Sequence, residues 1–110
     1  EIEFDLSTAQ SFTITASDDI NAFVLSNVPS GATSFTVKIL QDSTGSRSVG
    51  IDTFKDGSSG TTIPVFWPGG VLPIVTPTAD RSDIYSFKTF DGDNITSSGL
   101  YGVVGGQNFA

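Results

Sequence analysis

The chain has 110 residues, of which 12 are acidic and five are basic, so its net charge at neutral pH is −7. It contains no cysteine, methionine or histidine, which excludes disulfides, thiol chemistry, histidine–metal sites and a Ser-His-Asp triad. The acidic balance argues against binding to nucleic acid or to an anionic membrane, and no run of about 18 apolar residues is present to insert into a membrane.

Apolar and polar residues alternate along much of the chain, which predicts strands with one buried face. The alternating segments are 2–6, 12–16, 35–39 and 84–90. Two short, continuous apolar runs, 22–25 and 100–104, predict strands covered on both faces, by the core on one side and by a partner on the other.

Turn-forming residues separate these segments at intervals of about 8–12 residues. They lie at 29–31, 42–45, 55–60, 68–70 and 91–94. No segment carries the apolar stripe of an amphipathic helix. We therefore predict an all-β fold, an antiparallel β-sandwich or small barrel of about eight or nine strands, as a single domain over 1–110. Segment 45–60 is the densest in turn residues, and we expect it to be a mobile loop.

The acidic residues offer the one remaining route to catalysis, a pair of carboxylates as in glycoside hydrolysis. Nearly all of them lie in predicted turns or on polar strand faces, so we expect no catalytic residue, no cofactor and no enzyme. Asp80 and Asp83 flank Arg81, which we expect to neutralise them.

The turn Asp91-Gly92-Asp93-Asn94 is the stretch most similar to a metal site, because alternate oxygen ligands on a tight loop suit Ca²⁺. It is shorter than an EF-hand loop and lacks the distal glutamate. We expect a hairpin turn without a metal, with Asp91 and Asp93 as the calcium candidates. Asp18 and Asp19, next to Asn21, have a similar ambiguity.

Trp67 and Tyr101 are the candidate ligand contacts, because an exposed aromatic side chain can stack on a sugar ring. For Trp67 we favour the alternative that it fills the core beneath the Pro68-Gly69-Gly70 turn.

The stretch 100–110 is apolar and rich in glycine, although the ends of chains are usually polar and frayed. An apolar end of this kind must be buried, either against the domain's own core or against a neighbouring copy of the chain. Aromatic residues are enriched at subunit interfaces. We expect a subunit interface formed by Leu100, Tyr101, Val103, Val104 and Phe109.

Four blocks, in their order and spacing, resemble a C-terminal domain of the fibre and appendage proteins of tailed bacteriophages, especially cyanophage-like and marine ones. The blocks are 31–49 with the turn at 41–47, 66–77 with Trp67-Pro68-Gly69-Gly70, 80–92, and 101–109 with its Gly-Gly-Gln-Asn-Phe ending. The resemblance implies a non-enzymatic structural protein on the exterior of the virion, of which this chain is the C-terminal part. It also implies a homotrimer that contacts other virion proteins and a glycan or protein receptor on the host surface.

Two other functions fit the same residues. One is a capsid decoration or cement protein, which would assemble in the same way. The other is a carbohydrate-binding module that uses Trp67 and Tyr101. None of these readings involves nucleic acid or insertion into a membrane.

Overall fold

The computed structural model describes residues 1–110 and is mostly β, with 45% strand and 9% helix. The strands are β1 (Ile2–Asp5), β2 (Ser11–Ala16), β3 (Phe23–Ser26), β4 (Thr33–Gln41), β5 (Phe54–Asp56), β6 (Thr62–Ile63), β7 (Val65–Phe66), β8 (Ser82–Thr89) and β9 (Leu100–Phe109). The short helical turns are η1 (Pro68–Gly70), η2 (Gly92–Asn94) and α1 (Ile95–Ser98). None of the helical segments has the length and apolar character needed to cross a membrane.

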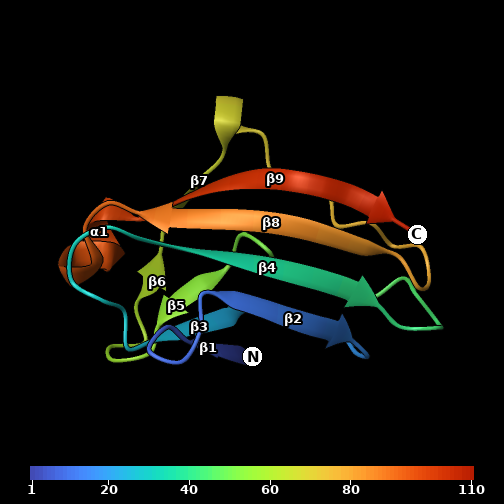
Figure 1. Cartoon of the computed structure of the whole chain (residues 1–110), viewed down its shortest axis with the longest axis horizontal. Coiled ribbons are helices and arrows are strands. Elements are labelled where there is room, and N and C mark those ends of the chain that lie inside the picture. The colour runs from blue at the N-terminus through green and yellow to red at the C-terminus, as the bar shows by residue number, and fades with distance from the viewer.

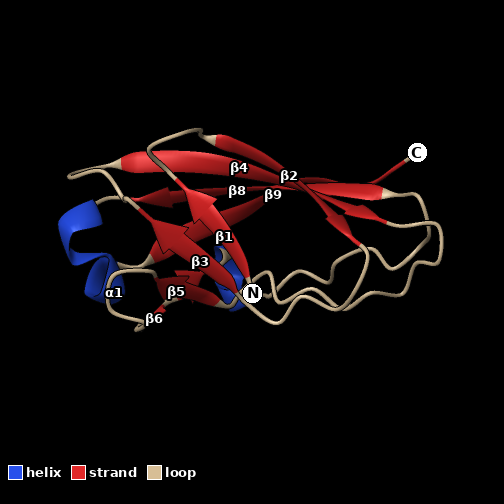
Figure 2. Ribbon diagram, turned by 90° about the horizontal axis from the view of Figure 1, so that it is seen from below, coloured by secondary structure: helices blue, strands red, loops and turns tan.

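The strands form two sheets, which Figure 2 shows edge-on as two layers. The order is β1-β3-β5-β6 in the four-stranded sheet and β2-β4-β8-β9-β7 in the five-stranded sheet. One of the sheets curves into a half-barrel. The prediction of a β-rich fold with eight or nine strands is confirmed.

The strand directions differ from the expected antiparallel pattern, because both sheets are mixed. The pairs β1–β3, β3–β5, β2–β4 and β7–β9 are parallel, whereas β4–β8, β8–β9 and β5–β6 are antiparallel. The first five strands alternate between the two sheets, so a strand that returns to its sheet runs parallel to the one before it. Alternating hydrophobicity reports which face of a strand is buried, and it contains no information about the partner strand.

A closed ring of five phenylalanine contacts joins the two sheets. Phe4, Phe23 and Phe54 come from the four-stranded sheet, and Phe35 and Phe87 come from the five-stranded sheet. Successive ring centroids around this phenylalanine cluster lie 5.1, 5.4, 4.9, 5.2 and 6.4 Å apart. All five side chains are buried, so the cluster is the centre of the core.

Segment 45–60 is irregular over most of its length, as expected of a loop, but it also contributes a short strand and two buried side chains to this core. It contains β5, which pairs with β3, and its Ile51 and Phe54 are buried. The two apolar side chains are separated by two polar residues and flanked by polar and glycine residues, so they form no recognisable period in the sequence.

Replacing Phe54 with alanine should lower the free energy of unfolding by about 3–5 kcal/mol, because it leaves a cavity between the sheets. Phe90 is 60% exposed, so Phe90→Ala is the matched control and should cost less than about 1 kcal/mol. Denaturant unfolding of both variants measures the difference. Equal losses would show that the core is not centred on the phenylalanine cluster.

Candidate functional site

The C-terminal strand β9 has an open edge. On one side it pairs with β8, from Lys88↔Tyr101 to Ser82↔Phe109. On the other side β7 pairs only with its first two residues, Leu100 and Tyr101. The rest of this edge has no neighbouring strand and forms the border of the sheet (Figure 1). An unpaired edge strand is a template for pairing with another chain.

Four of the five predicted interface residues are accessible on this strand. Tyr101, Val103, Val104 and Phe109 are each 42–48% exposed. Leu100 is fully buried in the core, so its assignment to the interface is wrong. It faces inward beside Pro64, whose carbonyl oxygen accepts its backbone N–H at 2.8 Å.

A second group of exposed apolar side chains lies in the loop that follows η1. Val71, Leu72 and Ile74 are 48–83% exposed and follow η1. The Gln107 side chain of β9 donates to the Ile74 carbonyl oxygen at 2.7 Å, which holds this loop against the strand. Val71, Leu72 and Ile74 were not predicted as interface residues, although the apolar run that starts at Val71 was the available signal.

Trp67 lies against the core, as the favoured interpretation predicted. Its ring makes edge contacts with Tyr85 and Phe87, at centroid distances of 6.4 and 5.6 Å. It occupies the space beside Gly102, where a Cβ atom would lie 2.7 Å from the indole. The indole nitrogen is buried. Trp67 is therefore a packing residue that requires glycine at 102, and the structure does not place it in a ligand site.

Tyr101 belongs instead to an exposed aromatic patch, which we define as Phe66, Phe90 and Tyr101. The Tyr101 ring lies 5.2 Å from Phe66 and 5.4 Å from Phe90, measured between centroids. The Lys88 ammonium lies 4.9 Å from the Phe90 centroid. Phe66 and Phe90 were not predicted as candidates, because they lie at strand ends that only the folded chain brings together.

Asp83 forms the centre of a buried polar network. Its Oδ2 accepts hydrogen bonds from the Thr76 backbone N–H at 2.7 Å, the Tyr85 hydroxyl at 2.8 Å and the Gln107 side-chain amide at 3.2 Å. Its Oδ1 accepts from the Asn108 amide at 2.9 Å. One carboxylate therefore joins the loop after η1, strand β8 and the end of β9.

The expected neutralisation by Arg81 is not observed. Arg81 donates to the Asn108 side-chain oxygen at 3.1 Å, and it makes no ion pair with Asp80 or Asp83. Neutral donors from Thr76, Tyr85, Gln107 and Asn108 satisfy Asp83 instead.

The pKa shifts in this network follow from burial and hydrogen bonding. Burial acts to raise the pKa of Asp83, but the bonds from Thr76, Asn108 and Tyr85 outweigh it and hold that pKa below its usual value. Burial and the bond to Asp83 raise the pKa of Tyr85. At neutral pH Asp83 is ionised and Tyr85 keeps its proton, so the pair is an anchor rather than a general acid.

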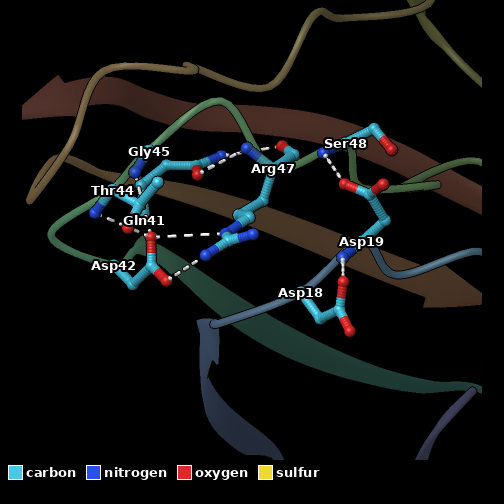
Figure 3. A network of polar contacts seen from close by, with 8 residues as sticks. All are labelled: Asp18, Asp19, Gln41, Asp42, Thr44, Gly45, Arg47 and Ser48. Carbon is cyan, nitrogen blue, oxygen red and sulfur yellow. Dashed lines mark hydrogen bonds and ion pairs between the residues drawn. The ribbon is translucent and has the colours of Figure 1, made fainter.

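The turn after β4 is held by its own side chains (Figure 3). Asp42 Oδ1 accepts from the amides of Thr44 and Gly45 at 3.1 and 2.9 Å, and its Oδ2 pairs with Arg47 at 2.9 Å. The Arg47 side chain lowers the pKa of Asp42. Gly45 has φ of 72°, and a Cβ there would lie 2.8 Å from Pro77 O. These polar groups bind one another and are not available for a ligand.

The structure of the segment from Asp91 to Asn94 also differs from the predicted hairpin turn. The connection between β8 and β9 contains η2 and α1, and it is not a tight hairpin turn. Asp91 Oδ2 accepts from the Asn94 amide and Asp93 Oδ1 accepts from Ser30 Oγ, both at 2.9 Å. The two carboxylates therefore have separate partners, and the structure has no group of three acidic side chains placed to hold a metal.

A pocket of about 470 Å³ lies beside α1 at one end of the sandwich. It is lined mainly by polar residues that include Ser26, Asp56, Ser58 and Asp93. Asp56 already accepts hydrogen bonds from Ser58, and Asp93 accepts one from Ser30. The polar groups of this pocket are thus largely satisfied within the chain.

No protein-family model matches this chain, and no curated protein or solved structure matches it. Three features of the chain itself bear on its function: the open edge of β9, the aromatic patch and the Asp83 network.

Asp83→Asn should lower the free energy of unfolding by about 2–3 kcal/mol, because the amide nitrogen cannot accept the bonds that a carboxylate oxygen accepts. Asp80→Asn makes the same change of charge at an exposed residue and should have little effect. Denaturant unfolding at pH 7 tests the pair. Equal stability of the two variants would contradict the anchoring role.

The stability difference between the wild type and Asp83→Asn should depend on pH. Because the folded pKa of Asp83 is depressed, its stabilisation is present above the unfolded value of about 3.9 and is lost as pH falls through the folded pKa. Melting temperatures between pH 6 and pH 2.5 should therefore converge at the acidic end. A difference in melting temperature that stays constant with pH would mean that the ionised form of Asp83 contributes nothing to stability.

Calcium should not change the melting temperature, because Asp91 and Asp93 hold separate partners. Scans with 5-fold excess Ca²⁺ or with EDTA should coincide for the wild type and for Asp91→Ala with Asp93→Ala. A Ca²⁺-dependent rise that the double variant loses would establish a metal site.

Proposed function

We propose that this chain is a structural domain on the exterior of a tailed-phage particle, of the fibre or appendage type, and that it assembles as a homotrimer through β9. The open edge of β9 is the observation that carries this proposal. The resemblance of four sequence blocks to phage appendage domains supports it independently.

Charge favours β9 as the contact between copies. Residues 100–110 contain no charged side chain, whereas the whole chain has a net charge of −7. Two copies repel each other over most of their surfaces, and the repulsion is weakest where no carboxylates meet. Burial of Val103, Val104 and Phe109 adds a favourable term of about 25 cal/mol per Å² of apolar surface.

The Asp83 network prepares this edge for association. Asn108 and Gln107 are both bonded to Asp83, so the end of β9 is ordered before a partner binds. Pre-ordering lowers the entropic cost of association. In a threefold assembly the three β9 edges can meet near the axis, and repeated copies strengthen weak contacts with a host surface.

A carbohydrate-binding role is the second candidate, and the aromatic patch favours it. Three exposed aromatic rings in mutual contact offer apolar faces on which sugars stack. Tyr101 keeps the role expected for it, while Phe66 and Phe90 replace Trp67. This role is compatible with an exterior appendage. A capsid decoration protein would use the same β9 edge. It differs from an appendage domain in its location, on the capsid rather than on an appendage of the particle.

Light scattering across a dilution series tests the assembly. The wild type should have the mass of three chains, and Phe109→Asp or Val104→Asp should shift it to one chain, because each buries a charge at the contact. Thr13→Asp adds the same charge on the exposed edge strand β2 and should leave the mass unchanged.

A wild type that remains a single chain at high concentration would contradict the homotrimer. A trimer that both β9 variants leave intact would move the interface elsewhere on the domain. Far-UV circular dichroism of each variant separates loss of assembly from loss of folding.

A further inference from the structure

The outer face of the five-stranded sheet has a charge opposite to that of the rest of the molecule. Of the twelve acidic residues, Asp83 is the only one within the five strands of this sheet, and its carboxylate is buried. Lys38 of β4 and Lys88 of β8 are both exposed, and neither makes an ion pair. The face is therefore cationic on a protein of net charge −7.

Strand register places these side chains in rows across the sheet. One row runs from Ser34 through Lys88 and Tyr101 to Phe66. Beside it, Thr36 and Ser86 lie opposite each other, with their hydroxyl oxygens 3.3 Å apart. The aromatic patch, one lysine and a group of hydroxyls thus share one continuous surface, which we call the outer sheet face.

We propose that the outer sheet face binds an acidic polysaccharide, a chain of sugars that carry carboxylate or sulfate groups. This inference deepens the proposed function, since it specifies the host-surface ligand of an exterior domain. Each part of the surface matches one part of such a ligand. The rings of Phe66, Phe90 and Tyr101 stack on sugar faces, the lysines pair with the acidic groups, and the hydroxyls bond to sugar hydroxyls.

The spacing of the two lysines indicates an extended ligand. Lys88 is paired with Ser34, and Lys38 lies four residues further along β4. At about 3.4 Å per residue, the two charges are separated by roughly 14 Å along the strand direction. A polymer with a repeated acidic group can reach both lysines while it contacts the aromatic patch, whereas a single small anion cannot.

The net negative charge of the protein does not prevent this binding. At physiological ionic strength the Debye length is about 8 Å, so a ligand on the outer sheet face interacts mainly with the charges of that face. Single-stranded nucleic acid also combines stacking with negative charge. It carries a phosphate at every residue, however, and two lysines neutralise few of them. The observations therefore favour the polysaccharide.

Calorimetric titration with hexamers of galacturonic acid tests the proposal, with maltohexaose as the neutral sugar of equal length. The wild type should bind the acidic hexamer at least 10-fold more tightly than maltohexaose. Lys88→Ala and Tyr101→Ala should each weaken binding at least 5-fold. Lys55→Ala is the matched control, because it removes the same charge from the opposite sheet, where Lys55 pairs with Glu1 at 2.6 Å, and it should bind as the wild type does.

Two further probes identify the ligand class. Polyglutamate should bind at least 10-fold more weakly than oligogalacturonate, and equal binding would show that charge alone is recognised and overturn the proposal. Tighter binding of oligo(dT) would assign the face to single-stranded nucleic acid and overturn it as well. An equal loss in Lys55→Ala and Lys88→Ala would show that the outer sheet face is not the site.

The mass of each variant separates this inference from the proposed function. A trimer that fails to bind oligogalacturonate overturns the polysaccharide site and leaves the assembly proposal standing. A single chain that binds it with the expected variant pattern supports the site and contradicts the homotrimer. Loss of binding in Tyr101→Ala is evidence for the stacking role only if the variant has the same mass as the wild type, because a change in assembly could also weaken binding.

Discussion

The contact between the two sheets is the constraint on which the rest of the molecule depends. The chain has no disulfide, and its first five strands pass alternately from one sheet to the other. The phenylalanine cluster joins both layers, so it fixes their separation and relative position. The five-stranded sheet extends past the smaller one, and loops cover the rest of its inner face (Figure 2). This unequal layering is the reason that β9 needs an additional anchor.

Asp83 provides that anchor with a buried charge. Its four bonds hold the loop after η1 and the end of β9 where few apolar contacts are available. A carboxylate suits the position because it accepts several backbone and side-chain donors at once. The hydrogen bonds offset the cost of burying the charged carboxylate. The pKa of Asp83 is therefore below its usual value, although burial alone would raise it.

The sequence predicted the fold class well and the connections between strands poorly. Alternating residues located β1, β2, β4 and β8, because burial on one face leaves a period of two. Parallel pairing was missed, since it depends on the path of the chain between sheets. Tyr101, Val103, Val104 and Phe109 were identified as exposed apolar residues that need a partner, whereas Leu100 was misplaced because adjacent strand residues point in opposite directions. Phe66 and Phe90 join Tyr101 only through tertiary contacts, which no local pattern contains.

The alternation of strands between sheets also has a consequence for how the chain reaches its structure. Neither layer consists of consecutive segments, so β1 finds β3, and β2 finds β4, only after an intervening strand has been placed in the opposite layer. Loops must therefore close over long separations before the pairings stabilise them, and a topology of this kind folds slowly. During that time the uncharged β9 segment is exposed on every chain that has not finished folding. A high concentration of newly made chains would thus favour contacts between incompletely folded copies at the same edge that the folded domain presents.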